Sequence, residues 1–224
     1  MPLCQRCRFT VSSDLIFFRY RALELALERM GFDGFAFQVS YVLSRLYGNH
    51  PGLADLENGF VGPNATSMFD TPEELVNGVG LLQHDRTHVL KAFGSYRFDF
   101  GLTAGISFFW ASGTPRSVRG GTSFGPPYQG YLTQRGTAGR TPSVWDVNLR
   151  FTYDIARWLN IGRSTRFVFD IFHVGSDKTP VEFDEIKYYS LDANGNQTDP
   201  NPDYGKPIRF QPPMSVRLGM EVNF

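Results

Sequence analysis

One stretch of sequence decides the fold: Met214-Ser215-Val216-Arg217-Leu218-Gly219-Met220-Glu221-Val222-Asn223-Phe224. Apolar and polar side chains alternate without interruption over these eleven residues. Successive side chains of a β-strand point to opposite faces, so the pattern predicts a strand with one apolar face and one wet face. Its length matches the roughly 9–11 residues with which a tilted strand crosses a bilayer.

Six further stretches alternate in the same way, and the connections between strands alternate in length. The strands are expected at residues 21–30, 35–44, 89–98, 102–111, 145–155 and 166–174. Short connections lie at 31–34, 99–101 and 156–164, and long polar ones at 48–86, 113–143 and 175–213. Short turns at one end and long loops at the other are typical of outer-membrane barrels. We therefore expect an all-β fold, namely an antiparallel transmembrane β-barrel segment of about seven strands with short periplasmic turns and long extracellular loops.

Two sets of side chains take positions that such a barrel would use. Aromatic residues near the predicted strand ends are candidates for the girdles at the two membrane interfaces. They are Tyr41, Tyr96, Trp110, Trp145, Tyr153 and Trp158. The polar faces of the later strands supply side chains expected to face the lumen: Asp146, Arg150, Asp154, Asp170, Arg217 and Glu221.

Composition excludes several functional classes. The chain has 224 residues, and its 22 basic and 22 acidic residues give no net charge, which argues against nucleic-acid binding. Hydrophobic residues make up 42% of the chain and aromatic residues 15%, too much for a disordered protein. Phosphate-binding glycine motifs, zinc-protease motifs and nucleophile elbows are absent from the sequence, so we predict neither an enzyme nor a cofactor.

Potential metal ligands have poor spacing. Cys4 and Cys7 form one C-x-x-C pair without a second, and His84 and His88 would lie about 13 Å apart along a strand. Residues 192–199 loosely resemble a calcium loop, but the glycine comes too early and the bidentate glutamate is absent. We predict no metal site.

Other loop features have structural interpretations. Asn194-Gly195 predicts a hairpin with a type I′ turn, and Thr71-Pro72-Glu73-Glu74-Leu75 predicts a short N-capped helix. The polar side chains of Asp55, Glu57 and Asn58 are expected in a solvated loop.

Several segments, in order, resemble the C-terminal barrel portion of TonB-dependent outer-membrane receptors of the Oar-like subgroup. The resemblance covers residues 17–224 and rests on Tyr20-Arg21-Ala22-Leu23-Glu24-Leu25, Ser40-Tyr41-Val42-Leu43-Ser44-Arg45, Tyr47-Gly48-Asn49-His50-Pro51-Gly52-Leu53, Asp85-Arg86-Thr87-His88, Ser112-Gly113-Thr114-Pro115, Arg135-Gly136-Thr137-Ala138-Gly139-Arg140-Thr141-Pro142 and Phe210-Gln211-Pro212-Pro213-Met214-Ser215-Val216-Arg217-Leu218-Gly219.

The resemblance implies a location in the outer membrane of a Gram-negative cell and a role in importing a bulky ligand. It implies contact with the lipid bilayer, and with the TonB complex in the full-length receptor. It also implies that the barrel-assembly machinery reads a terminal signal, here Val216, Leu218, Met220, Val222 and Phe224. Since plug, TonB box and export signal are not visible, we expect residues 17–224 to be a C-terminal barrel fragment and residues 1–16 to be a non-native or disordered leader.

Two alternatives remain open. One is a small self-standing barrel with a structural or adhesive role, which would need an eighth strand, for example at residues 8–18. The other is a soluble β-sandwich binding module, whose aromatic residues would form the core between two sheets.

Overall fold

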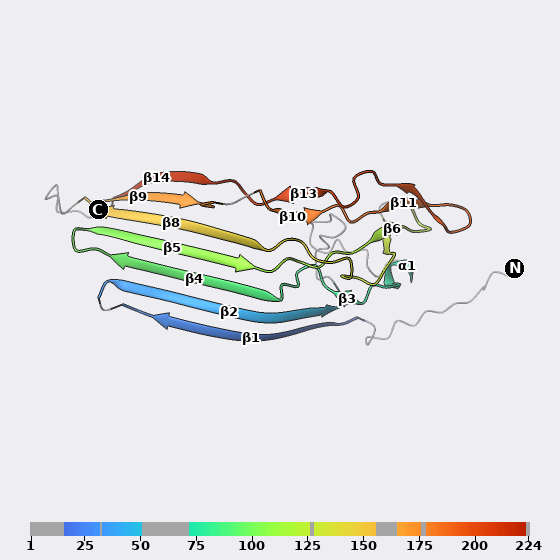
Figure 1. Ribbon diagram of the computed structural model, residues 1–224, viewed down its shortest axis with the longest axis horizontal. Coiled ribbons are helices and arrows are strands. Elements are labelled where there is room, and N and C mark those ends of the chain that lie inside the picture. The colour runs from blue at the N-terminus through green and yellow to red at the C-terminus, as the bar shows by residue number, and fades with distance from the viewer. Residues whose placement is uncertain are drawn as a thin grey trace.

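A computed structural model describes residues 16–31, 33–50, 72–125, 128–155, 165–175 and 178–222. Its main feature is a long antiparallel sheet in which seven strands follow the order β1-β2-β4-β5-β8-β9-β14, with the short β3 (Gly80–Leu81) beside β2 (Figure 1). The seven are β1 (Phe18–Arg29), β2 (Phe35–Gly48), β4 (His88–Arg97), β5 (Leu102–Ala111), β8 (Val144–Asp154), β9 (Thr165–Phe172) and β14 (Ser215–Val222). The predicted all-β class with antiparallel pairing is therefore confirmed.

Each stretch that alternates in the sequence contains one of these strands, although the ends differ. β2 continues to Gly48, beyond the predicted end at Ser44, because Tyr47 and Gly48 pair with β3. β9 stops at Phe172, before the predicted end at Val174, because His173 has a left-handed backbone with φ of 56°.

The strand register gathers the apolar positions on one face of the sheet. Across the middle of the sheet, Gly94 lies opposite Ile106, Ile106 opposite Leu149, and Leu149 opposite Ile171. Opposed residues project to the same side, so this row continues across four strands. The neighbouring row holds Ser107 and Asn148 and projects to the other side. The sheet is therefore continuous, with one mainly apolar and one mainly polar face, although Phe93 and Phe109 project to the polar side.

The apolar face has no cover within the described residues. Buried hydrophobic side chains are few, and they are Leu82, Ala111, Tyr131, Val144 and Ile155. By contrast, Leu218 is 79% exposed and Leu27 is 63% exposed, both on the apolar face. Large apolar surfaces of this kind mark contact with another phase or partner. A soluble β-sandwich would instead bury such a face against a second sheet.

Aromatic side chains gather near both ends of the apolar face. At the end nearer the long connections, Trp110 lies directly opposite Trp145. At the other end, Tyr153 lies opposite Leu102 and beside Phe167 in the register. Trp145 and Tyr153 are eight residues apart on one strand, roughly 27 Å. Of the predicted girdle residues, Trp158 lies outside the described residues.

Within the described residues, the two edge strands of the sheet, β1 and β14, each have one unpaired side. The strand ends that the short connections join, Arg29 and Phe35, Arg97 and Leu102, and Asp154 and Thr165, lie at one end of the sheet, and those that the long connections join lie at the other (Figure 1). No helix in the described part of the chain is both long enough and apolar enough to cross a membrane.

The long connections carry more structure than the sequence patterns predicted. They hold a helix and short strand pairs beyond the end of the sheet (Figure 1). These are α1 (Pro72–Leu75), β6 (Arg119–Gly121), β7 (Gln129–Tyr131), β10 (Pro180–Phe183), β11 (Tyr188–Leu191), β12 (Gln197–Pro200) and β13 (Pro207–Phe210). The short helix with proline at its first position is as predicted, whereas Thr71, its expected N-cap, lies outside the described residues.

The hairpin predicted around Asn194-Gly195 is formed by β11 and β12, but the type I′ turn is wrong. Type I′ needs positive φ at both residues, and here Gly195 has φ of 83° whereas Asn194 is not among the positive-φ residues. Gly195 N donates to Asp192 O at 3.0 Å, so the turn begins earlier, at Asp192. The Asp192 carboxylate fixes this longer loop by accepting from the backbone N–H groups of Asn194 and Asn196 at 2.9 and 2.8 Å.

This carboxylate makes the hairpin sensitive to acid. The side-chain amide of Asn196, followed by its backbone N–H, lowers the pKa of Asp192 below its usual value. Because the folded pKa is depressed, the stabilisation is present above the unfolded pKa of about 3.9 and is lost as pH falls through the folded pKa. We expect the ¹³C carboxyl resonance of Asp192 to titrate with a midpoint below 3.9, and the Asn196 amide to lose exchange protection over the same range. A midpoint at or above 3.9 would contradict this account.

Candidate functional site

The polar face of the sheet carries a buried carboxylate between two arginines. Asp170 on β9 lies opposite Arg150 on β8 and opposite Arg217 on β14. The Nε atom of Arg150 donates to Asp170 Oδ1 at 2.6 Å, and Nη2 of Arg217 donates to Asp170 Oδ2 at 2.6 Å. Asp170 is only 1% exposed, whereas the side chains of the two arginines are more than half exposed. This triad links three adjacent strands and has one excess positive charge.

Substitutions in the triad measure how much the polar face of the sheet contributes to stability. We expect Asp170→Asn to lower the free energy of unfolding by about 2 kcal/mol, since charge-assisted hydrogen bonds contribute roughly 1.5–3 kcal/mol. Arg150→Gln should cost less than 1 kcal/mol, because the Arg150 side chain is largely exposed and Arg217 still pairs with Asp170. Urea unfolding in detergent micelles measures both. Equal costs for the two variants would mean that the triad does not centre on Asp170.

The other residues expected to face the lumen lie on the same polar face. Asp146 Oδ1 lies 2.8 Å from His173 Nδ1, and Asn148 accepts the His173 backbone N–H at 3.0 Å, so both hold the left-handed end of β9. Asp154 lies opposite Arg166 and Arg166 opposite Glu221, near the short turns. The register thus brings five of the six side chains together in two groups, one around Asp170 and one near the short turns, whereas Asp146 lies with His173 at the other end of β8.

The residues that carried the family resemblance meet in a second network, at the long-loop end of the sheet. The Asp85 carboxylate accepts the backbone N–H of Leu46 at 2.5 Å and pairs with the Arg140 guanidinium. Arg140 Nη1 also donates to the carbonyl of Gly113 at 2.8 Å. A side chain at Gly113 would meet the Thr141 carbonyl, 1.6 Å from an added Cβ, so glycine is required there. Asp85, 1% exposed, therefore joins the end of β2 to the long connection between β5 and β8.

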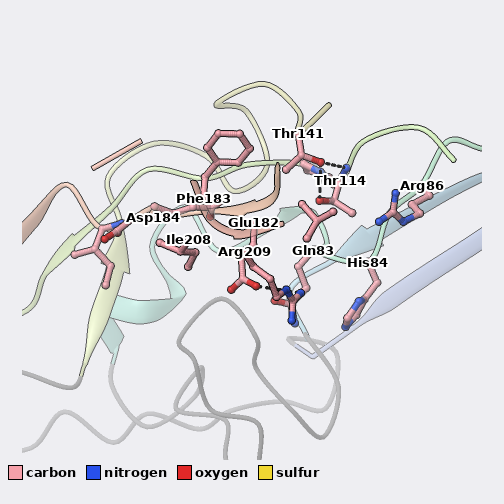
Figure 2. A pocket seen from close by; sticks show the side chains of 14 residues that line it. Gln83, His84, Arg86, Thr114, Thr141, Glu182, Phe183, Asp184, Ile208 and Arg209 are labelled. Carbon is pink, nitrogen blue, oxygen red and sulfur yellow. Dashed lines mark hydrogen bonds and ion pairs between the residues drawn. The ribbon is translucent and has the colours of Figure 1, made fainter. Parts of the chain in front are cut away.

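Beside this network lies a cavity of about 380 Å³, shown in Figure 2. One side is lined by Gln83, His84, Arg86, Thr114, Pro115 and Thr141, and the other by β10, the residues following it and β13. Glu182 and Arg209 form an ion pair at 3.0 Å, and Arg86 donates to the Ser112 carbonyl at 2.7 Å. Burial lowers the pKa of the Arg86 guanidinium. The site combines fixed charges with the apolar side chains of Val181, Phe183 and Ile208.

The sequence motifs gave no indication of this cavity. Glu182 and Arg209 meet only because two short strands, each beginning with a proline, pair across 23 intervening residues of a long connection. The nearest sequence motif is Asp85-Arg86-Thr87-His88, of which Arg86 lines one wall of the cavity.

The potential metal ligands do not gather. Among the described residues, no group of three or more His, Cys, Asp or Glu side chains could hold a metal ion. His88 begins β4 with Nδ1 2.7 Å from the Tyr41 hydroxyl, whereas His84 lies in the preceding turn and not on the strand. Cys4, Cys7, Asp55, Glu57 and Asn58 lie outside the described residues.

Comparison with known proteins supports the resemblance seen in the sequence. Over 92% of its length the chain is 30% identical to the TonB-dependent transporter Oar of Myxococcus xanthus. The chain spans only 22% of that protein, and the matched part is its C-terminal portion. No family model matches the chain, and no solved structure matches it. Identity over nearly the whole chain, together with the all-β antiparallel fold, confirms its similarity to the C-terminal barrel portion of an Oar-like TonB-dependent transporter.

Proposed function

We propose that the chain forms the C-terminal part of the barrel wall of a TonB-dependent transporter in an outer membrane, and that the whole transporter imports a bulky ligand. The observation that carries the proposal is the uncovered apolar face of the main sheet, on which Leu218 is 79% exposed. A barrel strand turns such a face to lipid and its polar face to the lumen. The similarity to Oar supplies the transporter class.

This arrangement assigns each feature of the chain to one side of the membrane, to an interface or to the lumen. The triad of Arg150, Asp170 and Arg217 would face the lumen together with Asp146, Asp154 and Glu221. The short turns would lie in the periplasm, and the cavity would lie outside the cell. Trp110 and Trp145 would sit at the outer interface, where amphipathic rings are favoured. The edge strands of the sheet, β1 and β14, would pair with further barrel strands, because lipid does not tolerate unpaired backbone groups.

A segment exchange tests this topology. We would replace the matched C-terminal portion of the Myxococcus xanthus transporter by this chain and insert an epitope tag after Gly195 in one version and after Asp99 in another. Intact cells should bind an antibody to the first tag alone, and both tags should react after the outer membrane is permeabilised. Labelling of the Asp99 tag on intact cells, or recovery of the chimera outside the outer membrane, would refute the proposal.

The last strand is proposed to carry the assembly signal. Val216, Leu218, Met220 and Val222 project to the apolar face of β14, whereas Phe224 lies outside the described residues. We expect deletion of Phe224 to reduce the assembled chimera several-fold without changing its synthesis, measured as the protease-resistant fraction in the outer membrane. Substitution of the polar-face residue Ser215 by threonine serves as the control. An unchanged assembled fraction would remove Phe224 from the signal.

A further inference from the structure

We propose that an arginine cluster on the apolar face of the sheet, formed by Arg19, Arg21 and Arg45, binds a phosphate-bearing lipid of the outer leaflet. The inference rests on the proposed function, because it takes the apolar face to meet lipid, and it adds a binding site to that face. Three features of the described strands carry it: the sign of the charges on this face, the lack of carboxylate partners for the cluster, and its position along β1 and β2.

The apolar face carries charge at few positions, and every charge is positive. In the seven strands as the structure describes them, the charged side chains on this face are all arginines, namely Arg19, Arg21, Arg29 and Arg45. Arg21 on β1 lies directly opposite Arg45 on β2. Like charges that face each other across two strands repel and destabilise the pair. An anion between the two guanidinium groups would replace this repulsion with attraction.

The three clustered arginines have no carboxylate partner in the described part of the chain. Two of them lie over aromatic rings instead. The guanidinium carbon of Arg45 is 5.4 Å from the centroid of Tyr47, and that of Arg19 is 5.6 Å from the centroid of Phe17. Such contacts use the flat face of a guanidinium and leave the N–H groups at its edge for other partners. Because all three arginines are exposed, these N–H groups can reach an anion outside the protein.

The cluster lies at the long-loop end of the apolar face. One cross-strand row of this face runs from Tyr41 on β2 to Trp110 and Trp145, which the proposed arrangement places at the outer interface. Arg45 follows Tyr41 by four residues, so it lies roughly 13 Å farther along the strand toward the long connections. A cation on the lipid face is costly at the bilayer midplane but not near the interface. The arginines therefore lie at the level of the lipid headgroups.

The neighbouring side chains define the class of lipid. Leu23 lies opposite Leu43, in the row between the arginine pair and the row of Tyr41. These leucines offer apolar surface to acyl chains directly beside the guanidinium groups. Phosphate accepts two parallel hydrogen bonds from one guanidinium, so Arg21 and Arg45 together match a phosphorylated headgroup. A lipid with phosphate on its headgroup satisfies the arginines and the leucines at once.

Lipid binding by the chimeric transporter in detergent micelles tests the proposal. The probe is diphosphoryl lipid A, compared with the same lipid after enzymatic removal of its phosphates. We expect saturable binding of the phosphorylated lipid, and about tenfold weaker binding by the double variant Arg21→Gln, Arg45→Gln, which loses charge-assisted hydrogen bonds. The matched control is the double variant Arg29→Gln, Lys91→Gln. It removes the same charge from the short-turn end of the apolar face and from the polar face, and its affinity should be unchanged.

Two further measurements separate the site from folding and from the binding of free anions. Without lipid A, the unfolding midpoint of Arg21→Gln, Arg45→Gln should not fall, because the variant relieves repulsion between facing charges. Excess inorganic phosphate should leave the bound lipid in place, because the leucines also hold its acyl chains.

The proposal would be overturned by equal affinity of the wild type and Arg21→Gln, Arg45→Gln, or by equal binding of the dephosphorylated lipid. Displacement of the lipid by inorganic phosphate, or a lower unfolding midpoint of the double variant, would overturn it as well. Membrane topology is read separately from the epitope tags. Failure of lipid binding and failure of the barrel proposal are therefore distinguishable.

Discussion

Ile106→Arg is expected to destabilise the membrane-inserted protein by about 2–4 kcal/mol, the cost of a cation on the lipid face of a barrel near the bilayer midplane. Ile106 lies midway along β5 on the apolar face, where it is 49% exposed. In water, a charged side chain at such an exposed position would cost little. The expected loss therefore depends on lipid covering this face. Urea unfolding of the chimeric transporter in phospholipid vesicles measures it.

The matched control is Ser107→Arg, the next residue along the same strand. Ser107 lies opposite Asn148 on the polar face, so its arginine would extend into water. We expect a change below 0.5 kcal/mol, as for ordinary surface substitutions. If both variants have similar stability, or if Ser107→Arg is the more damaging one, then the two faces of the sheet are assigned the wrong way round.

Asp85→Ala is expected to cost about 3–5 kcal/mol in the stability of the long-loop end, the range for removing one partner of a buried ion pair. The substitution leaves the Arg140 guanidinium without its carboxylate and the Leu46 backbone N–H without its acceptor. Hydrogen–deuterium exchange should show faster exchange in residues 112–118 and 135–141, while the centre of β5 keeps its protection. This pattern follows because the network joins connections and not the middle of the sheet.

Asp85→Asn separates the charge from the hydrogen bond. Its side-chain oxygen can still accept the Leu46 N–H, so we expect a smaller loss and intermediate exchange. Uniform acceleration along β5 in Asp85→Ala would show that the network supports the whole sheet. Unchanged exchange in residues 135–141 would show that Asp85 does not hold that connection.

The sheet could be predicted from the sequence because its signal is local. In residues 102–111, alternate side chains have to serve two different environments, and the period of two is visible without knowledge of the neighbouring strands. The predicted ends of two strands were wrong, since the ends depend on partners elsewhere in the chain. β2 is extended by its pairing with β3, and β9 is shortened by the left-handed His173.

Apart from the helix α1 and the β11–β12 hairpin, the structure of the long connections could not be predicted, because it depends on distant pairing. β10 and β13 are four residues each and show no alternating pattern of useful length. At Asn194-Gly195, local preference indicated type I′, but the Asp192 carboxylate stabilises a longer loop instead.

The candidate site was predicted only in part. The period placed Arg150, Asp170 and Arg217 on polar faces, but only the strand register brings them within hydrogen-bond distance. The cavity could not be predicted, because it forms only where the network around Asp85 meets the paired strands β10 and β13.

The most direct test of the central claim is spin-label accessibility along β5 of the chimeric transporter in vesicles. Single cysteines at positions 104, 106 and 108 replace apolar-face residues, and those at 105 and 107 replace polar-face residues. If the apolar face meets lipid, labels at 104, 106 and 108 collide preferentially with oxygen, and labels at 105 and 107 collide preferentially with a water-soluble nickel chelate. Equal exposure of all five labels to the chelate would contradict the account, because it would place both faces of the sheet in water.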